Sequence, residues 1–185
     1  MGGHALRVCV YCASSDGIPA HHLELAHAVG SGIAARGWEL VTGGGRVSMM
    51  GAVAAAARAG GARTVGVIPR ALIRREVADE GVDELLVTDT MRERKALMEV
   101  HAEAFLTLPG GIGTCEEFFE VWTAGSLGMH GKPVVLLDPH GHYDGLLRWL
   151  QGLSEGGFLH PGALARVTVV REVDAALDAC APARR

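Results

Sequence analysis

Residues 108–117, LPGGIGTCEE, place a glycine-rich turn directly before two glutamates. Glycine lets the backbone approach a ligand closely, and a helix that follows directs free N–H groups and a positive dipole end toward that ligand. This arrangement is typical of a phosphate site. A carboxylate placed against phosphate would repel it, so Glu117 must serve either the helix itself or a part of the ligand remote from the phosphate.

A second glycine-rich stretch, VTGGGRVSMMG at 41–51, has the same context of strand, glycines and helix. The segment CASSDG at 12–17 adds a serine turn that contains Ser14. One such loop is weak evidence, because a simple tight turn also requires glycine. Two of them in one small domain, together with the serine turn, favour a phosphate site.

The glycine loops do not match the dinucleotide fingerprint G-x-G-x-x-G. Ser48 takes the third glycine position in the first loop, and Glu116 takes it in the second. Asp138, at the end of the apolar run VVLLD, stands where a ribose-binding acid would follow, so a dinucleotide remains an alternative. A P-loop is excluded, because no G-x-x-x-x-G-K-[ST] segment occurs.

Glu117 has two interpretations. TCEE matches a capping box, with Thr114 as the N-cap and Glu117 at the third helical position. Alternatively, the carboxylate acts beside Arg94, from the basic segment MRERKALM at 91–98. A phosphate cradle, an arginine and a carboxylate together fit cleavage of the glycosidic bond of a nucleoside monophosphate, whose transition state is oxocarbenium-like. The ribose would then separate the acid from the phosphate.

Strand-like and helix-like runs alternate along the whole chain. This predicts a single α/β domain over 1–185, with a doubly wound, Rossmann-like parallel sheet flanked by helices and a loose tail at 181–185. The expected helices lie at about 20–35, 49–59, 91–102, 115–124 and 143–153, with a last one ending near 180. Ligands bind beyond the carboxyl ends of the strands in such sheets. The three loops should therefore face the same side.

The composition narrows the class of partner. A net charge of −4 without a basic run argues against nucleic acid, and the longest apolar runs are too short to cross a membrane. No charged segment followed by a long apolar run opens the chain, so no signal peptide is evident. The expected reduced cysteines predict a cytoplasmic location. The helices at 91–102 and 115–126, apolar around much of their circumference, predict a homodimer.

Cysteines and histidines give no sign of a metal site. Cys9 and Cys12 form a CxxC, but strand side chains three residues apart point to opposite faces, so buried, reduced thiols are expected. The histidines at 21–22 and 140–142 have no acid or cysteine at ligand spacing and are expected to be solvated.

Four segments resemble the LOG (Lonely Guy) family, often described as lysine decarboxylases. PGGIGTCEE resembles its PGGxGTxxE signature, and MRERKALM, VTGGGRVSMMG and VCVYCASS resemble three further motifs, in family order between about residues 7 and 150. The resemblance implies a cytokinin riboside 5′-monophosphate phosphoribohydrolase, which hydrolyses an N6-substituted AMP to free base and ribose 5-phosphate. It also implies a homodimer, AMP or N6-prenylated AMP as substrate, and no cofactor or metal.

Carried onto this chain, the resemblance makes Arg94 and Glu117 catalytic. The implied substrate-binding residues are Ser14, Gly43, Gly44, Gly45, Arg94, Lys95, Met98, Gly110, Gly111, Gly113 and Thr114. Three positions depart from the family pattern. Ala13 and Ser48 replace glycines and should leave the cradle usable, whereas Arg92 replaces a histidine and leaves the nucleotide preference open.

Three alternative functions remain at this point. A carrier of a nucleotide or cofactor would need the glycine loops but not Arg94 together with Glu117. A dehydrogenase would have to bind NAD. A decarboxylase would need a Schiff-base lysine, and the chain has only Lys95 and Lys132, the latter at the start of a strand and thus at the wrong end of the sheet.

Overall fold

The computed structural model describes residues 4–74 and 77–181, and within them one parallel sheet of seven strands. The strand order is β4-β3-β2-β1-β5-β6-β7. The strands are β1 (Arg7–Tyr11), β2 (Glu39–Thr42), β3 (Thr64–Pro69), β4 (Glu84–Thr88), β5 (Ala104–Thr107), β6 (Val134–Leu137) and β7 (Val167–Val170). The order confirms the predicted doubly wound α/β fold. Of the predicted loose tail, only Ala181 lies within the described residues.

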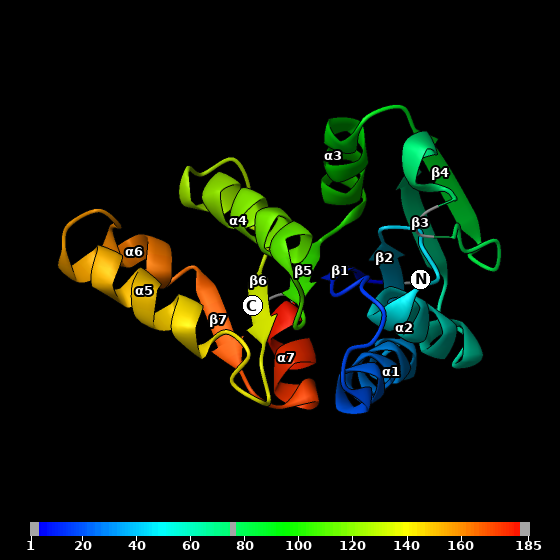
Figure 1. Cartoon of the computed structure of the whole chain (residues 1–185), viewed down its shortest axis with the longest axis horizontal. Coiled ribbons are helices and arrows are strands. Elements are labelled where there is room, and N and C mark those ends of the chain that lie inside the picture. The colour runs from blue at the N-terminus through cyan, green and yellow to red at the C-terminus, as the bar shows by residue number, and fades with distance from the viewer. Residues whose placement is uncertain (1–3, 75–76, 182–185) are drawn as a thin grey trace.

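Helices cover both faces of the sheet (Figure 1). They are α1 (Ala20–Ala35), α2 (Ser48–Ala59), α3 (Met91–His101), α4 (Ile112–Ser126), α5 (Asp144–Glu155), α6 (Pro161–Leu164) and α7 (Val173–Cys180), with a short 3₁₀ turn η1 (Arg70–Leu72). In Figure 1, α1, α2 and α7 gather on the lower face, and α3 and α4 lie above. None of the described helices is long and apolar enough to cross a membrane.

The central strands are buried on both faces, which explains their continuous apolar runs. One core cluster joins the sheet to α1, α2 and α7, and a second joins it to α3, α4 and α5. Cys12 belongs to the first cluster and Cys9 to the second, and both are free thiols. The prediction that these cysteines are buried on opposite faces is confirmed.

The start of α4 corrects the predicted capping box. Helix α4 begins at Ile112 with Gly111 as its N-cap, and no side chain caps it. Thr114 is therefore the third helical residue, and Glu117 lies in the second turn. The reason is the glycine at 110: a Cβ there would come within 2.1 Å of Thr114 Oγ1, so only glycine lets the helix start this early.

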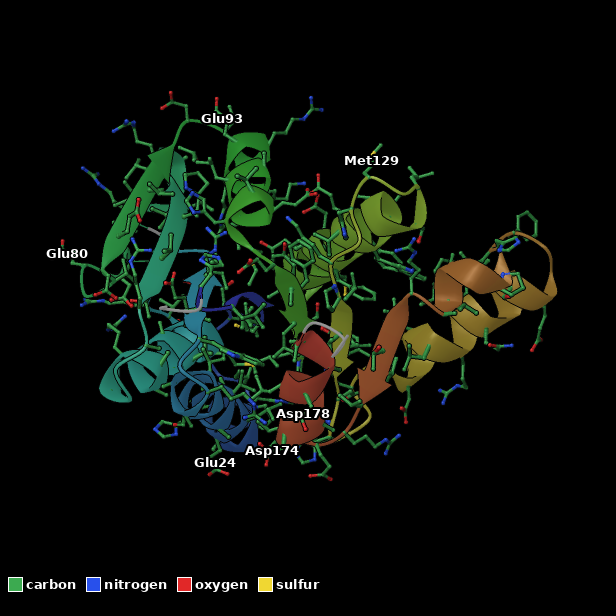
Figure 2. The ribbon with its side chains drawn as sticks, turned by 180° about the vertical axis from the view of Figure 1, so that it is seen from behind. Glu24, Glu80, Glu93, Met129, Asp174 and Asp178 are labelled. Atoms are coloured by element: carbon green, nitrogen blue, oxygen red, sulfur yellow. The ribbon has the colours of Figure 1, made fainter. Side chains whose placement is uncertain are left out.

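A capping box does exist, at the start of α3. The Glu93 N–H donates to Thr90 Oγ1 at 3.1 Å, and the Thr90 N–H donates to Glu93 Oε2 at 3.1 Å. Figure 2 shows Glu93 at the outer end of this helix. The box sets where α3 begins, and α3 carries Arg94.

Replacement of Thr90 by alanine should destabilise the protein by about 1 kcal/mol, because it removes the cap at the start of α3. For a chain of this size, the melting temperature should fall by roughly 2–4 °C. Differential scanning calorimetry would measure the change. Ser31→Ala, at an exposed position inside α1, is the control and should not lower the melting temperature. An unchanged melting temperature for Thr90→Ala would contradict the role of the box.

Candidate functional site

A cavity of about 210 Å³ opens where the strand order reverses, between β1 and β5. This is the position at which doubly wound sheets bind ligands. The cavity draws on all three predicted loops, because β1, β2 and β5 are neighbours in a parallel sheet. The predicted site residues that line it are Ser14, Gly43, Arg94, Met98, Gly111, Gly113, Thr114 and Glu117.

Arg94 is buried, with 4% of its surface exposed, and it reaches across from α3 to β3 and the loop after β2. Its Nε donates to the Val67 carbonyl at 3.1 Å, and its Nη2 donates to the Gly43 carbonyl at 2.9 Å. A Cβ at position 43 would lie 2.0 Å from Nη2. Gly43 is therefore glycine because the guanidinium occupies the space of a side chain.

Gly44 and Gly45, the other glycines of this loop, differ from Gly43 in their surroundings. Gly44 has a φ of +75°, and a Cβ there would lie 3.1 Å from Ile68 Cβ and from the Val67 backbone nitrogen. The Gly45 N–H points to Met50 Sδ at 3.3 Å. Neither residue lines the cavity. They let the loop turn and pack on β3, and direct contact with a phosphate stays a prediction for both.

Ser48, one of the departures from the family pattern, begins α2 with a φ of +51°. This left-handed conformation favours glycine and costs another residue about 1–2 kcal/mol. The backbone thus keeps the shape that a glycine would allow. Ala13, the other small replacement, donates its N–H to the Pro109 carbonyl at 3.1 Å and ties the serine turn to the second glycine loop.

The N-terminus of α4 is uncapped and has open space beside it. The first N–H groups of a helix have no partner within the helix, and here no side chain caps them. A Cβ on Gly111 or Gly113 would meet no atom within 4 Å. These glycines therefore leave space beside the helix end rather than avoid a clash within the protein.

Glu117 lines the cavity from α4 and influences the thiols beneath it. Burial raises the pKa of the Cys12 thiol well above its usual range, and the charge of Glu117 raises it further. The pKa of Cys9 is raised in the same way, first by burial and then by Glu117. Both thiols stay protonated near neutral pH, so Cys12 is not a nucleophile although it borders the cavity.

Of the basic residues in the segment MRERKALM, Arg94 alone lines the cavity. Lys95 Nζ contacts Glu116 and, at 2.9 Å, Glu120 Oε2, so it joins α3 to α4 beside the site. Arg92 is exposed and does not line the cavity. The positive charge of Arg92 is therefore not part of the cavity wall. A contact between Lys95 and the substrate stays a prediction.

Asp138 does not serve as a ribose-binding acid. It is 3% exposed, and its two carboxylate oxygens accept the backbone N–H groups of His142 at 2.8 Å and Tyr143 at 2.7 Å. The carboxylate shapes the loop after β6. The dinucleotide alternative loses the residue that had kept it open.

Sequence reasoning missed a group of four histidines. The rings of His21 and His22 lie 4.1 Å apart, His140 lies 4.5 Å from His21, and His142 lies 6.1 Å from His22, measured between centroids. The loop after β6 brings the two pairs together, which no spacing in the sequence reveals. Among the described residues, no group of three or more His, Cys, Asp or Glu side chains could hold a metal ion.

Comparison with known proteins identifies the family of this chain. Residues 50–180 match the family model described as possible lysine decarboxylase. The chain is 58% identical over 177 residues to the cytokinin riboside 5′-monophosphate phosphoribohydrolase of Mycobacterium tuberculosis, covering 95% of this chain and 93% of the relative. It is 42% identical over 157 residues to the Arabidopsis thaliana protein of that name designated LOG3, covering 85% and 73%.

Solved structures share the fold at lower identity. The molybdenum cofactor binding protein from Rippkaea orientalis matches with a TM-score of 0.71 and 20% identity, covering 96% of each chain. The Moco carrier protein from Chlamydomonas reinhardtii matches with a TM-score of 0.71 and 23% identity, covering 95% of each chain. These likenesses show the architecture alone, whereas the sequence relatives share nearly the full length of the chain. The chain belongs to the LOG family, the cytokinin riboside 5′-monophosphate phosphoribohydrolases.

Proposed function

We propose that the protein hydrolyses the N-glycosidic bond of adenosine 5′-monophosphates, plain or N6-substituted, and releases the free base and ribose 5-phosphate. The observation that carries this proposal is that Arg94 and Glu117 line the same cavity as the uncapped N-terminus of α4. The names of the sequence relatives support the same reaction.

In this proposal, the length of the helix separates the phosphate from the carboxylate. From Ile112 to Glu117, α4 rises by about 7.5 Å, at 1.5 Å per residue. A phosphate at the helix N-terminus and a carbon facing Glu117 are therefore separated by roughly the length of a ribose. The carboxylate then faces C1′, which becomes positive as its bond to the base breaks, and does not face the phosphate.

Glu117 and Arg94 take separate roles in this proposal. The Glu117 carboxylate stabilises the cationic ribose or removes a proton from the attacking water. The water oxygen bonds to C1′, the bond from C1′ to the base nitrogen breaks, and the base leaves with a proton. Arg94, held by two backbone carbonyls, binds the nucleotide and stabilises the transition state.

A decarboxylase that uses pyridoxal phosphate has no suitable lysine. Burial would lower the pKa of Lys95, but hydrogen bonds with Glu116 and Glu120 raise it above its usual value. A Schiff-base lysine needs the opposite change, because its neutral form attacks. Lys132 Nζ donates to the Glu99 carbonyl at 2.6 Å, at the C-terminal end of α3, and does not line the cavity.

A carrier that binds a nucleotide or cofactor without turnover is the alternative function that the sequence left open. A carrier would use the glycine loops and the helix end but would not need a carboxylate opposite the ribose. Release of free base from AMP separates the two functions.

We place the protein in a reducing cytoplasm on the basis of its buried thiols, and cell fractionation would test this location.

We also propose a homodimer through the two helices that the sequence pointed to, α3 and α4, at their exposed rather than their buried side chains. Phe118, Val121 and Trp122 are buried within the subunit and so need no partner chain. Val100, near the C-terminal end of α3, and Leu127 and Met129, just beyond the C-terminal end of α4, are exposed apolar residues. Figure 2 shows Met129 projecting outward beyond the end of α4. Leu127 and Met129 line a shallow groove that a second copy would cover.

The phosphate should be required for turnover. The protein should release adenine from AMP but should release at least about 100-fold less from adenosine, because binding energy at the α4 N-terminus positions the reacting ribose. Incubation with AMP, isopentenyl-AMP and adenosine, followed by chromatography of the released base, would measure this. Equal turnover of AMP and adenosine would contradict the proposal.

Replacement of Glu117 by glutamine should lower kcat by about 10²–10⁴, the usual contribution of a positioned acid or base, because the variant keeps the shape and loses the charge. AMP affinity should change little, because the phosphate is held at the N-terminus of α4 in this proposal. Glu120→Gln, one turn further along α4, is the matched control and should keep the parental kcat. Arg94→Ala should weaken AMP binding as well as turnover. A parental kcat for Glu117→Gln would make the carboxylate structural.

The dimer should dissociate when charge enters the exposed apolar surface. Leu127→Asp should give a monomer mass in light scattering at micromolar concentration, because the charge would be buried in the interface. Phe158→Asp places the same charge on another exposed apolar residue, beyond α5, and should leave the dimer intact. A monomeric parent protein would refute the dimer, and a dimeric Leu127→Asp protein would refute this surface.

A further inference from the structure

We propose that His142 and Tyr143 are positioning residues for the phosphate-binding turn at 109–111, an inference that rests on the function proposed above. Both residues lie in the loop between β6 and α5, outside the motifs that resemble the family. They contact the turn from behind. Their role would be to hold its backbone ready for the phosphate.

Three successive carbonyls of the turn and the residue before it have partners. The Tyr143 hydroxyl donates to the Leu108 carbonyl at 2.8 Å, and His142 Nε2 lies 2.8 Å from the Gly110 carbonyl. Because a carbonyl only accepts, Nε2 carries the hydrogen. The carbonyl between them, of Pro109, accepts the Ala13 N–H at 3.1 Å. The direction of each peptide plane from 108 to 111 is thereby set.

The carbonyl directions determine where the amides point. A trans peptide is planar, so the N–H of each residue points opposite to the carbonyl that precedes it. The Gly111 N–H is therefore directed away from His142, and Gly111 lines the cavity that Arg94 and Glu117 share. Holding the Gly110 carbonyl on one side of the turn holds the Gly111 amide on the other.

Hydrogen bonds and packing fix the positions of His142 and Tyr143 in the loop after β6. The buried carboxylate of Asp138 accepts the backbone N–H groups of both His142 and Tyr143. Tyr143 is 4% exposed and packs in the core cluster beneath α4, and its ring meets that of His142 edge-on at 4.7 Å between centroids. The two donors are thus presented to the turn from a fixed base.

The turn needs such support because of its composition and surroundings. Gly110 and Gly111 have wide conformational freedom, so an unsupported turn would lose entropy when it binds phosphate. A second cavity, of about 330 Å³ and lined by His22, Met49 and His142, lies on the other side of Gly110 and Gly111. With space behind the turn, the contact from His142 limits its movement in that direction.

Calorimetric binding of ribose 5-phosphate and of adenosine tests this inference without turnover. His142→Leu and Tyr143→Phe should each weaken ribose 5-phosphate binding by about tenfold, the effect of losing one useful hydrogen bond, and leave adenosine binding unchanged. His142→Gln, which keeps a donor at the end of the side chain, should remain within about threefold of the parent. His140→Leu, in the same histidine group, is the control and should bind both ligands as the parent does.

The outcomes that contradict the inference differ from the outcome that contradicts the proposed function. Parental ribose 5-phosphate affinity in both His142→Leu and Tyr143→Phe would overturn it, and so would an equal loss of adenosine affinity, which indicates general damage. His142 is exposed, so His142→Leu should fold even if Tyr143→Phe does not. A parent that binds ribose 5-phosphate but leaves AMP intact would overturn the proposed function alone. A parent that does not bind ribose 5-phosphate would overturn the positioning role.

Discussion

The site depends on one buried cation. The guanidinium of Arg94 is almost fully removed from water, and the carbonyls of Val67 and Gly43 replace part of its hydration. A buried charge costs several kcal/mol unless groups around it compensate the lost hydration, and these two carbonyls supply part of that compensation. Those two carbonyls come from β3 and from the loop after β2. The guanidinium therefore connects α3 to β3 and to the loop after β2, and it fixes one wall of the cavity.

This constraint explains why the glycines are not equivalent. Gly43 makes room for the guanidinium, Gly44 makes room for β3, and Gly110 makes room for the first turn of α4. Gly111 and Gly113 make room for nothing in the protein and leave the helix end open. A glycine-rich loop thus combines residues that build the wall with residues that expose backbone amides to a ligand.

Much of this could be predicted from the sequence, because the signals are local. Alternating apolar runs gave the doubly wound sheet, and the helix at 20–35 has the predicted bounds. Parallel strands bring their carboxyl ends together, so the meeting of three loops followed from the fold class. The start of α4 was predicted three residues too late because TCEE satisfies the rules of a capping box, whereas the clash that makes Gly110 necessary arises only once the helix has formed.

Other features depend on tertiary contacts and have no local signal. The four histidines come together from α1 and from the loop after β6, more than 100 residues apart in the chain. Asp138 matched the position of a ribose-binding acid, but its burial against two backbone amides assigns it to the loop. The helices at 91–102 and 115–126 were predicted to form a subunit interface, but no local signal shows that Phe118, Val121 and Trp122 of α4 are buried within the subunit.

The central claim is that phosphate and carboxylate act at the two ends of one ribose. A crystal structure of the Glu117→Gln protein with bound AMP tests this claim most directly, because the variant should hold its substrate intact. The account predicts the phosphate within hydrogen-bonding distance of the backbone amides at the start of α4, with C1′ of the ribose facing the side chain at 117. A base at the start of α4, or a ribose turned away from position 117, would contradict it.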